Sequence, residues 1–338
     1  MKKLFLFSLA SALALYLVVG LVDFGDAAGK GKPPPPPAAP PNPVIAYVAV
    51  AWPYNELAVA DADGKNQTAL LSSDQVGYFF PNWSPDLNPI KEGFQGSIVY
   101  EQGSQARNSQ NLDLWVVDVE ITTSGVTYSN ARELVRKGSA AAWSPQGDKI
   151  AYLSHDDDPS KRGIRILDLV SGVDSLLIPD PTPEDSTQNA NWPAWNPAGT
   201  RLAYTYYYYD GQLDHSEVRI RDLSNGYDFT LVENFSASAL DWSRSGKFIA
   251  APALGGITYV TAASDEFEEV TIETLPGTTW AQSPTWKPDT DDNQIVYMNR
   301  NRSGASKRKI VEFDLTTGIE TVIIERNTYH LYEPDWRR

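Results

Sequence analysis

The hydrophobic residues of this chain occur in short runs that share one sequence pattern. Most copies read isoleucine or leucine, then alanine or valine, then tyrosine. Runs this short, separated by turn-forming residues, predict β-strands. The copies are Ile45-Ala46-Tyr47, Ile98-Val99-Tyr100, Ile150-Ala151-Tyr152, Leu202-Ala203-Tyr204, Ile249-Ala250-Ala251 and Ile295-Val296-Tyr297.

A tryptophan followed by a tight turn precedes five of these six runs. Proline presets φ for the turn and glycine or aspartate completes it, so two strands fold back on each other. A sixth tryptophan, Trp336, ends the series near the C-terminus, and successive tryptophans lie 60, 52, 47, 44 and 50 residues apart. The five complete turns are Trp83-Ser84-Pro85-Asp86, Trp143-Ser144-Pro145-Gln146-Gly147, Trp195-Asn196-Pro197-Ala198-Gly199, Trp242-Ser243-Arg244-Ser245-Gly246 and Trp286-Lys287-Pro288-Asp289.

Each unit continues into a third strand, which ends in aspartate in all but the fifth unit, where Thr261 takes that place. A glycine turn into a fourth strand often follows. We expect these aspartates to be structural, accepting backbone N–H bonds at the turn. They are Asp61, Asp118, Asp168, Asp222 and Asp314. Four short strands in about 50 residues, repeated about six times, predict a β-propeller.

The two ends of the repeat region predict how the ring closes. The first unit begins at its second strand, whereas residues 332–336 form a lone first strand. Joining them completes one blade from both termini and leaves no exposed sheet edge in the ring. The predicted fold is therefore an all-β, six-bladed propeller with four antiparallel strands per blade, closed by the C-terminal strand.

The tryptophan turns, which lead into Ile-Ala-Tyr-like strands and, in all but the fifth unit, a later aspartate, resemble the repeats of the TolB-like propellers. The resemblance covers residues 44–338. It implies the six-bladed fold, export from the cytoplasm and protein binding at a propeller face. TolB itself has an α/β domain before its propeller, where this chain has a proline-rich stretch. Because the domain context differs, TolB's own partner, a peptidoglycan-associated lipoprotein, is not carried over.

Composition excludes several other classes of function. The chain has 338 residues and a formal net charge of −15, which disfavours binding to nucleic acid or to an anionic membrane surface. It contains no cysteine, so disulfides, thiolate metal sites and cysteine nucleophiles are excluded. We find no Gly-x-Ser-x-Gly elbow and no phosphate-binding loop, and we expect neither enzymatic activity nor a cofactor.

The N-terminal region reads as a targeting segment and a spacer. Residues 4–22 carry no charge and follow two lysines, and small residues come next. Residues 1–28 are therefore predicted to be a signal peptide, or an uncleaved anchor that would be the sole membrane contact. Residues 29–43 are rich in proline and predict a stiff polyproline II linker. The propeller then occupies residues 44–338 and is expected to be periplasmic or otherwise extracytoplasmic, and monomeric.

Function in such a ring is expected in the loops that differ between blades. Loops that lead into first strands share one end of the ring with loops that join second and third strands. This end is predicted to bear aromatic side chains at the channel mouth and a basic loop in the last blade. Aromatic residues and arginine are favoured in protein interfaces. The predicted partner-binding residues are Phe79, Phe80, Trp192, Trp280, His330, Tyr332, Arg300, Arg302 and Arg308.

Two other uses of this end stay open. The partner is expected to be another cell-envelope protein or a peptide, but the aromatic residues could instead only plug the channel. The alternative function is a metal-dependent polysaccharide lyase or hydrolase that uses the three histidines of the chain, His155, His215 and His330. Accidental surface histidines explain them more simply. The tyrosine run 206–209 points weakly to carbohydrate binding without chemistry.

Overall fold

A computed structural model describes residues 43–85, 94–104, 112–122, 125–180, 189–253, 255–263, 268–288, 291–299, 308–326 and 329–337. The predicted signal segment 1–28 and nearly all of the linker 29–43 lie outside these residues. Within them the secondary structure is almost entirely β-strand, with one 3₁₀ turn, η2 (Pro159–Lys161).

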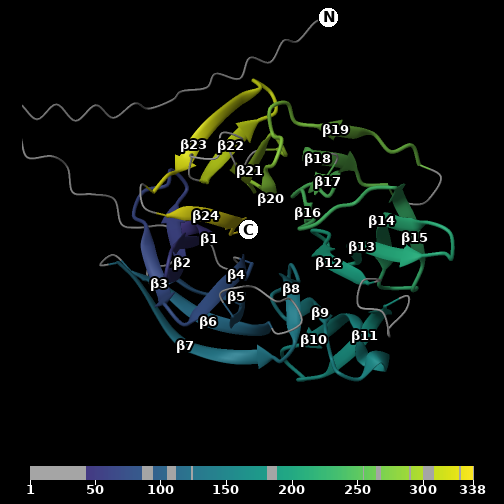
Figure 1. The fold of residues 1–338 in the computed structure, drawn as a ribbon, viewed down its shortest axis with the longest axis horizontal. Helices are drawn as coiled ribbons and strands as arrows, with labels where there is room; N and C mark the ends of the chain where they lie inside the picture. The colour runs from purple at the N-terminus through teal and green to yellow at the C-terminus, as the bar shows by residue number, and fades with distance from the viewer. Residues whose placement is uncertain are drawn as a thin grey trace, which may run out of the picture. The chain divides into compact units, whose positions relative to one another are not determined.

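The strands form six four-stranded antiparallel sheets arranged as a ring (Figure 1). This confirms the predicted six-bladed propeller. We number the blades by the chain order of their second strands and give each blade from the channel outward. Blade 1 is β24 (His330–Trp336), β1 (Pro43–Ala51), β2 (Tyr54–Asp61) and β3 (Thr68–Ser73); blade 2 is β4 (Val76–Trp83), β5 (Phe94–Ser104), β6 (Asp113–Thr122) and β7 (Gly125–Val135); blade 3 is β8 (Gly138–Trp143), β9 (Lys149–Ser154), β10 (Gly163–Asp168) and β11 (Asp174–Pro179).

The remaining three blades repeat this order. Blade 4 is β12 (Ala190–Trp195), β13 (Arg201–Tyr209), β14 (Asp214–Asp222) and β15 (Asp228–Glu233); blade 5 is β16 (Asp241–Trp242), β17 (Phe248–Ala253), β18 (Gly256–Thr261) and β19 (Ile272–Thr274); blade 6 is β20 (Gln282–Trp286), β21 (Gln294–Asn299), β22 (Lys309–Asp314) and β23 (Ile319–Ile324).

The ring closes as the sequence predicts. Strand β24 pairs antiparallel with β1, in a register that sets Ile45 opposite Trp336 and Val50 opposite His330. Blade 1 is thus built from both ends of the propeller region, and Figure 1 shows the last strand lying beside the first. Because β24 supplies the innermost strand of its blade, it also contributes to the wall of the central channel.

The core is divided among the six interfaces between neighbouring blades. Six clusters of buried apolar side chains each join residues of two adjacent blades. In blade 2, Ile98 and Tyr100 belong to the cluster shared with blade 1, whereas Val99 belongs to the cluster shared with blade 3. Successive strand residues point to opposite faces, and both faces of a blade are covered. This is why the second strands are apolar without alternation.

The tyrosine that ends the repeated run has a role of its own. In blades 3, 4 and 6 its ring is buried in the interface, and its hydroxyl donates to a carboxylate on the outermost strand of the same blade. Tyr152 donates to Asp174 at 2.9 Å, Tyr204 to Asp228 at 2.7 Å, and Tyr297 to Glu320 at 2.6 Å. Burial of tyrosine requires such a partner for its hydroxyl. In these three blades the tyrosine therefore links the second strand to the fourth.

Candidate functional site

The innermost strands of the six blades surround a central channel with a cavity of about 340 Å³. Five of the innermost strands carry a bulge in which one residue has a positive φ, and in blade 5 the corresponding residue, Ala239, has a positive φ just before β16. We call these residues the bulge ring: Phe80, Ala140, Trp192, Ala239, Ser283 and Glu333. Glycine adopts a positive φ without strain, but none of these six residues is glycine. All six line the cavity, so each bulge residue places a side chain at the channel.

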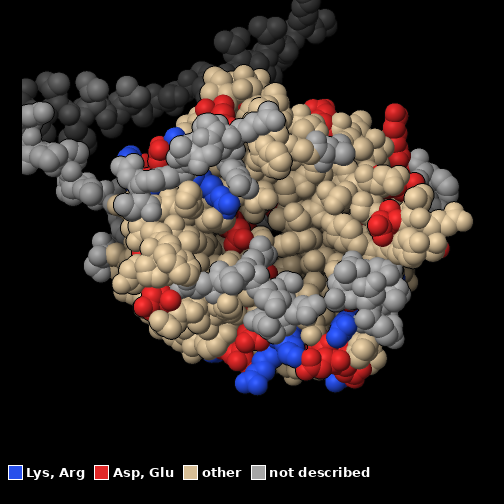
Figure 2. Space-filling view, in the orientation of Figure 1, with Lys and Arg blue, Asp and Glu red and all other residues tan. Residues whose placement is uncertain are grey.

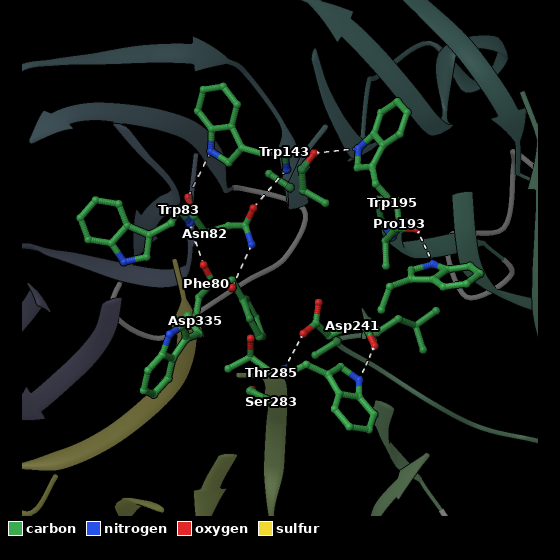
Figure 3. Close-up of a pocket in the computed structure, with 18 of the residues that line it drawn as sticks. Phe80, Asn82, Trp83, Trp143, Pro193, Trp195, Asp241, Ser283, Thr285 and Asp335 are labelled. Atoms are coloured by element: carbon green, nitrogen blue, oxygen red, sulfur yellow. Dashed lines mark hydrogen bonds between the residues drawn. The ribbon is translucent and has the colours of Figure 1, made fainter. Parts of the chain in front are cut away.

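Two residues after each bulge residue, a second set of side chains lines the channel. We call it the inner ring: Asn82, Ala142, Ala194, Asp241, Thr285 and Asp335. The repeated tryptophan follows directly in every strand. Figure 3 shows members of both rings converging from different blades on the hollow at the centre.

Four of the six tryptophans join neighbouring blades through an indole N–H. The indole N–H of Trp143 donates to the carbonyl of Asn82 at 3.2 Å, and that of Trp195 to Ala142 at 3.1 Å. Trp242 donates in the same way to Ala194 at 3.0 Å, and Trp286 donates to Asp241 at 3.1 Å. A residue that recurs in every blade therefore meets a need that the blades share (Figure 3).

Polar side chains of the rings add a second kind of contact between blades. Asp335 accepts the backbone N–H of Trp83 at 2.7 Å and the amide of Asn82 at 3.1 Å. Asn82 in turn accepts the backbone N–H of Trp143 at 3.1 Å. Burial within the ring raises the pKa of Asp335 to about 7, although the hydrogen bonds from Trp83 and Asn82 oppose this shift. Its carboxylate therefore lies in the channel wall without full compensation of its charge.

The aspartates at the ends of third strands are mostly as expected. Asp168 accepts the backbone N–H groups of Val170 and Ser171, and Asp222 and Asp314 accept equivalent bonds from residues two or three positions ahead. Asp118 differs, because the donors to its carboxylate are the side chains of Ser97, Asn130 and Arg132. These residues hold turns, and they lie far from the channel lining.

Two of the predicted binding residues meet inside the channel. Phe80 and Trp192 were expected in loops, but they lie within β4 and β12, where the bulges turn their rings inward. Their ring centroids are 4.8 Å apart in an edge-to-face arrangement, and both side chains are half-buried. They come from blades 2 and 4, so the pair spans the position of Ala140 on blade 3. Phe79, which precedes Phe80 in the strand, is half-buried as well.

The other predicted residues are distributed over the end of the ring where first strands begin. Trp280 precedes β20 and has 55% of its surface exposed, and His330 at the start of β24 is exposed. Tyr332 is half-buried against the core of blades 1 and 2, with the guanidinium of Arg308 4.0 Å from its ring centroid. Tyr332 therefore contributes to packing. Arg300 and Arg302 lie outside the described residues.

This same end carries exposed apolar side chains that sequence reasoning missed. Trp52 is 83% exposed in the turn between β1 and β2, Tyr54 at the start of β2 is 53% exposed, and Leu213 is 66% exposed in the turn between β13 and β14. Both turns join second to third strands, so they lie at the end that bears Trp280. An aromatic residue at the tip of a predicted hairpin was the available signal. We call Trp52, Tyr54, Leu213 and Trp280 the exposed apolar set.

The three histidines occupy separate environments. His155 is mostly buried, with Nε2 2.9 Å from the Ser139 hydroxyl, and desolvation lowers its pKa to about 4. His215 contacts Asp210 at 2.8 Å and stacks on Tyr208. His330 belongs to another blade. Within the described part of the chain, no group of three or more histidine, cysteine, aspartate or glutamate side chains is placed to hold a metal ion. The alternative metal site gains no support from this arrangement.

Comparison with known proteins establishes the fold. No family model matches the sequence, and no curated protein matches it. Among solved structures, TolB from Acinetobacter baumannii superimposes with a TM-score of 0.61 at 19% identity. The alignment covers 87% of this chain and 66% of the TolB chain, which is just under two thirds of its length. The chain therefore has the TolB-like six-bladed propeller fold, as the repeats predict.

Other propeller structures are more distant. An oligogalacturonate lyase in complex with manganese aligns with a TM-score of 0.44 at 12% identity, over 84% of this chain and 74% of the lyase. A puromycin-hydrolysing peptidase from Mycobacterium tuberculosis aligns with a TM-score of 0.47 at 14% identity, over 82% and 53% of the two chains. Among the described residues there is no helix long and apolar enough to cross a membrane.

Proposed function

We propose that this protein is an exported, non-enzymatic propeller that binds another cell-envelope protein or a peptide at the mouth of its channel. The observation that carries the proposal is the exposed apolar set, in which Trp52 and Trp280 present 83% and 55% of their surfaces to solvent at one end of the ring. Large aromatic side chains are costly to expose, and they are enriched among residues that dominate binding energy. The TolB-like fold supports a binding role, and the similarity to TolB also supports an extracytoplasmic location.

The predicted binding residues have different roles in this proposal. Trp280 and His330 offer contact surface at the mouth, with Phe79 beside the channel opening. Phe80 and Trp192 form the floor that a partner would meet inside the channel. The guanidinium of Arg308 lies over the ring of Tyr332, so it presents the partner with a positive charge at a fixed position beside the mouth. Arg300 and Arg302 are proposed as further electrostatic guides. The protein is proposed to act as a monomer, without a cofactor.

The test is capture of a partner by the full-length protein from solubilised envelopes of the source organism. The variant carries Trp52→Ala and Trp280→Ala, because both side chains are exposed and their loss leaves the core intact. Tyr128→Ala is the matched control, since Tyr128 is 50% exposed on the outermost strand β7. We expect one partner to bind the wild type and the control, and to bind the double variant at least tenfold more weakly. Equal capture by all three proteins would reject the mouth as the binding site.

A further inference from the structure

The wall of the channel has one polar side and one apolar side. In the inner ring, Asp241, Thr285, Asp335 and Asn82 follow one another on blades 5, 6, 1 and 2, and the two remaining positions are alanines on blades 3 and 4. Since the blades follow one another around the ring, the four polar residues form a continuous arc. The alanines form the facing arc.

The bulge ring is divided in the same way. Its polar members, Ser283 and Glu333, stand on blades 6 and 1, within the polar arc of the inner ring. Its aromatic members, Phe80 and Trp192, stand on blades 2 and 4 and contact each other. A guest in the channel would therefore meet carboxylates on one side and aromatic and methyl groups on the other.

The polar arc contains a hydroxyl that has no partner. The side chain of Thr285 is 2% exposed, lines the channel, and its Oγ1 makes no hydrogen bond in the structure. Figure 3 shows it on the channel wall beside Asp241, with Asp335 on the next blade. A buried hydroxyl without a partner costs about 1–3 kcal/mol. A donor placed in the channel would satisfy it.

Negative charge prevails in the lining. Three carboxylates line the cavity, Asp241, Glu333 and Asp335, against one cation among the described lining residues, Arg244. Arg244 lies in the turn after Trp242, at the opposite end of the channel from the mouth. Acidic side chains are visible in the wall of the central hollow in Figure 2. Burial raises the pKa of Asp335, so a cation in the channel would lower the cost of its charged form.

We propose that the channel receives a lysine or arginine side chain from an extended segment of the partner protein. The cationic head contacts Asp241, Asp335 and the Thr285 hydroxyl, and the aliphatic stem lies against Phe80 and Trp192. Lysine and arginine combine an apolar stem with a charged head, which matches the two sides of this wall. A cation beside an aromatic face adds further attraction. This inference rests on the proposed function, because it names the chemistry of the partner.

The size of the cavity agrees with a guest of this kind. Pockets for drug-sized ligands measure about 300–1,000 Å³. At about 340 Å³ the channel lies near the lower limit, so it accommodates one long side chain with its flanking backbone. The partner would therefore contact the exposed apolar set with its surface and insert a single residue.

The test measures binding of three capped tripeptides to the full-length protein by isothermal titration calorimetry. Their central residues are lysine, arginine and norleucine, and norleucine keeps the stem without the charge. We expect the two cationic peptides to bind at least tenfold more tightly than the norleucine peptide. Asp241→Asn keeps an oxygen to accept the Trp286 N–H and should weaken cationic binding at least tenfold. Thr285→Val removes only the unpartnered hydroxyl and should weaken it several-fold.

The matched control is Glu120→Gln, an exposed carboxylate on β6 that removes the same charge outside the channel. The affinities should stay unchanged, because Glu120 lies outside the channel and contributes only one unit to the net charge of −15, which attracts any cation weakly. Equal affinity for norleucine and lysine, or equal losses in Asp241→Asn and Glu120→Gln, would overturn the inference. Partner capture that depends on Trp52 and Trp280 would stand in that case, so the two proposals fail separately.

Discussion

The interface between blades 4 and 5 and the interface between blades 1 and 2 solve the same problem with different bonds. At the first, the indole of Trp242 donates to the carbonyl of Ala194, and the inner ring contributes only the alanine methyl. At the second, the indole nitrogen of Trp83 is buried and makes no hydrogen bond. There the carboxylates of Glu333 and Asp335 accept backbone N–H groups of β4.

The two interfaces also differ in their place in the chain. Blades 4 and 5 are consecutive, whereas β24 meets β4 across more than 250 positions, as the bonds from Phe80 to Glu333 and from Trp83 to Asp335 record. Contacts at such separation must offset the entropy of closing a long loop. Hydrogen bonds to ionised groups are about twice as strong as neutral ones. The closing strand thus contributes two carboxylates. Carboxylates also act between some consecutive blades, where Asp241 accepts the backbone N–H of Trp286 and Glu101 accepts that of Ala140, but not between blades 4 and 5, where the bond runs from an indole to a carbonyl.

The largest expected effect is the loss of the closing strand's anchor. Trp336 is 3% exposed and packs in the cluster shared by blades 1 and 6. Trp336→Ala should lower the free energy of unfolding by about 4 kcal/mol, the usual range for a buried tryptophan. Urea denaturation followed by circular dichroism measures it.

Trp143→Ala is the comparison for this substitution. Trp143 stands at the same repeat position of blade 3, but its side chain is only half-buried. It should lose roughly half as much stability, since less area leaves water on folding. If both variants lose the same amount, the buried area of the tryptophan does not set the cost of its loss at this repeat position.

A smaller effect is expected from the pH dependence of the closing interface. The pKa of Asp335 is about 7 in the folded protein and about 4 in an unfolded chain. The folded state therefore binds this proton more tightly, and the favourable contribution is complete below about pH 4 and declines as pH rises to about 7. Asp335→Asn removes the titration. The stability of the variant relative to wild type should rise by at most about 4 kcal/mol across this window, because the pKa difference of about three units is worth about 1.4 kcal/mol per unit.

Other titrating groups are common to both proteins and cancel in this difference. His155, with a lowered pKa of about 4, stabilises the fold increasingly as pH rises toward its ordinary value. Asp180, raised by burial to a pKa of about 6, acts in the same direction as Asp335. Unfolding of both proteins in urea at several pH values gives the difference. A difference that does not change with pH would show that the Asp335 carboxylate is not desolvated.

The sequence was sufficient for the fold because the repeat is local. The turn after Trp143 and the run from Ile150 to Tyr152 lie within ten residues, so their spacing predicts a pair of strands without knowledge of the rest. Closure could also be predicted, since a lone strand ending at Trp336 and a first unit lacking that strand require each other. These predictions need only the number and order of the strands, because a closed ring then determines which strands are neighbours.

The candidate site was less predictable because it is made between blades. Phe80 was expected in a loop, but a bulge within β4 turns it into the channel to meet Trp192. The bond from Trp83 to Asp335 joins residues that no local pattern relates. Trp52 was overlooked because the first blade has no preceding tryptophan turn to mark its hairpin. The local sequence pattern predicts strands, whereas packing between blades determines which side chains meet in the channel.

The smallest expected effect separates the two kinds of interface most directly. Trp242 and Trp83 are equally buried, at 3% and 4% exposure, but only Trp83 has an indole nitrogen without a partner. Phenylalanine removes the N–H and a similar apolar area from either site. Trp242→Phe should therefore cost about 1 kcal/mol more than Trp83→Phe, the net contribution of one hydrogen bond. Parallel urea titrations of the two variants measure this difference. Equal losses would mean that the bond from Trp242 to the Ala194 carbonyl adds nothing to the stability of the interface.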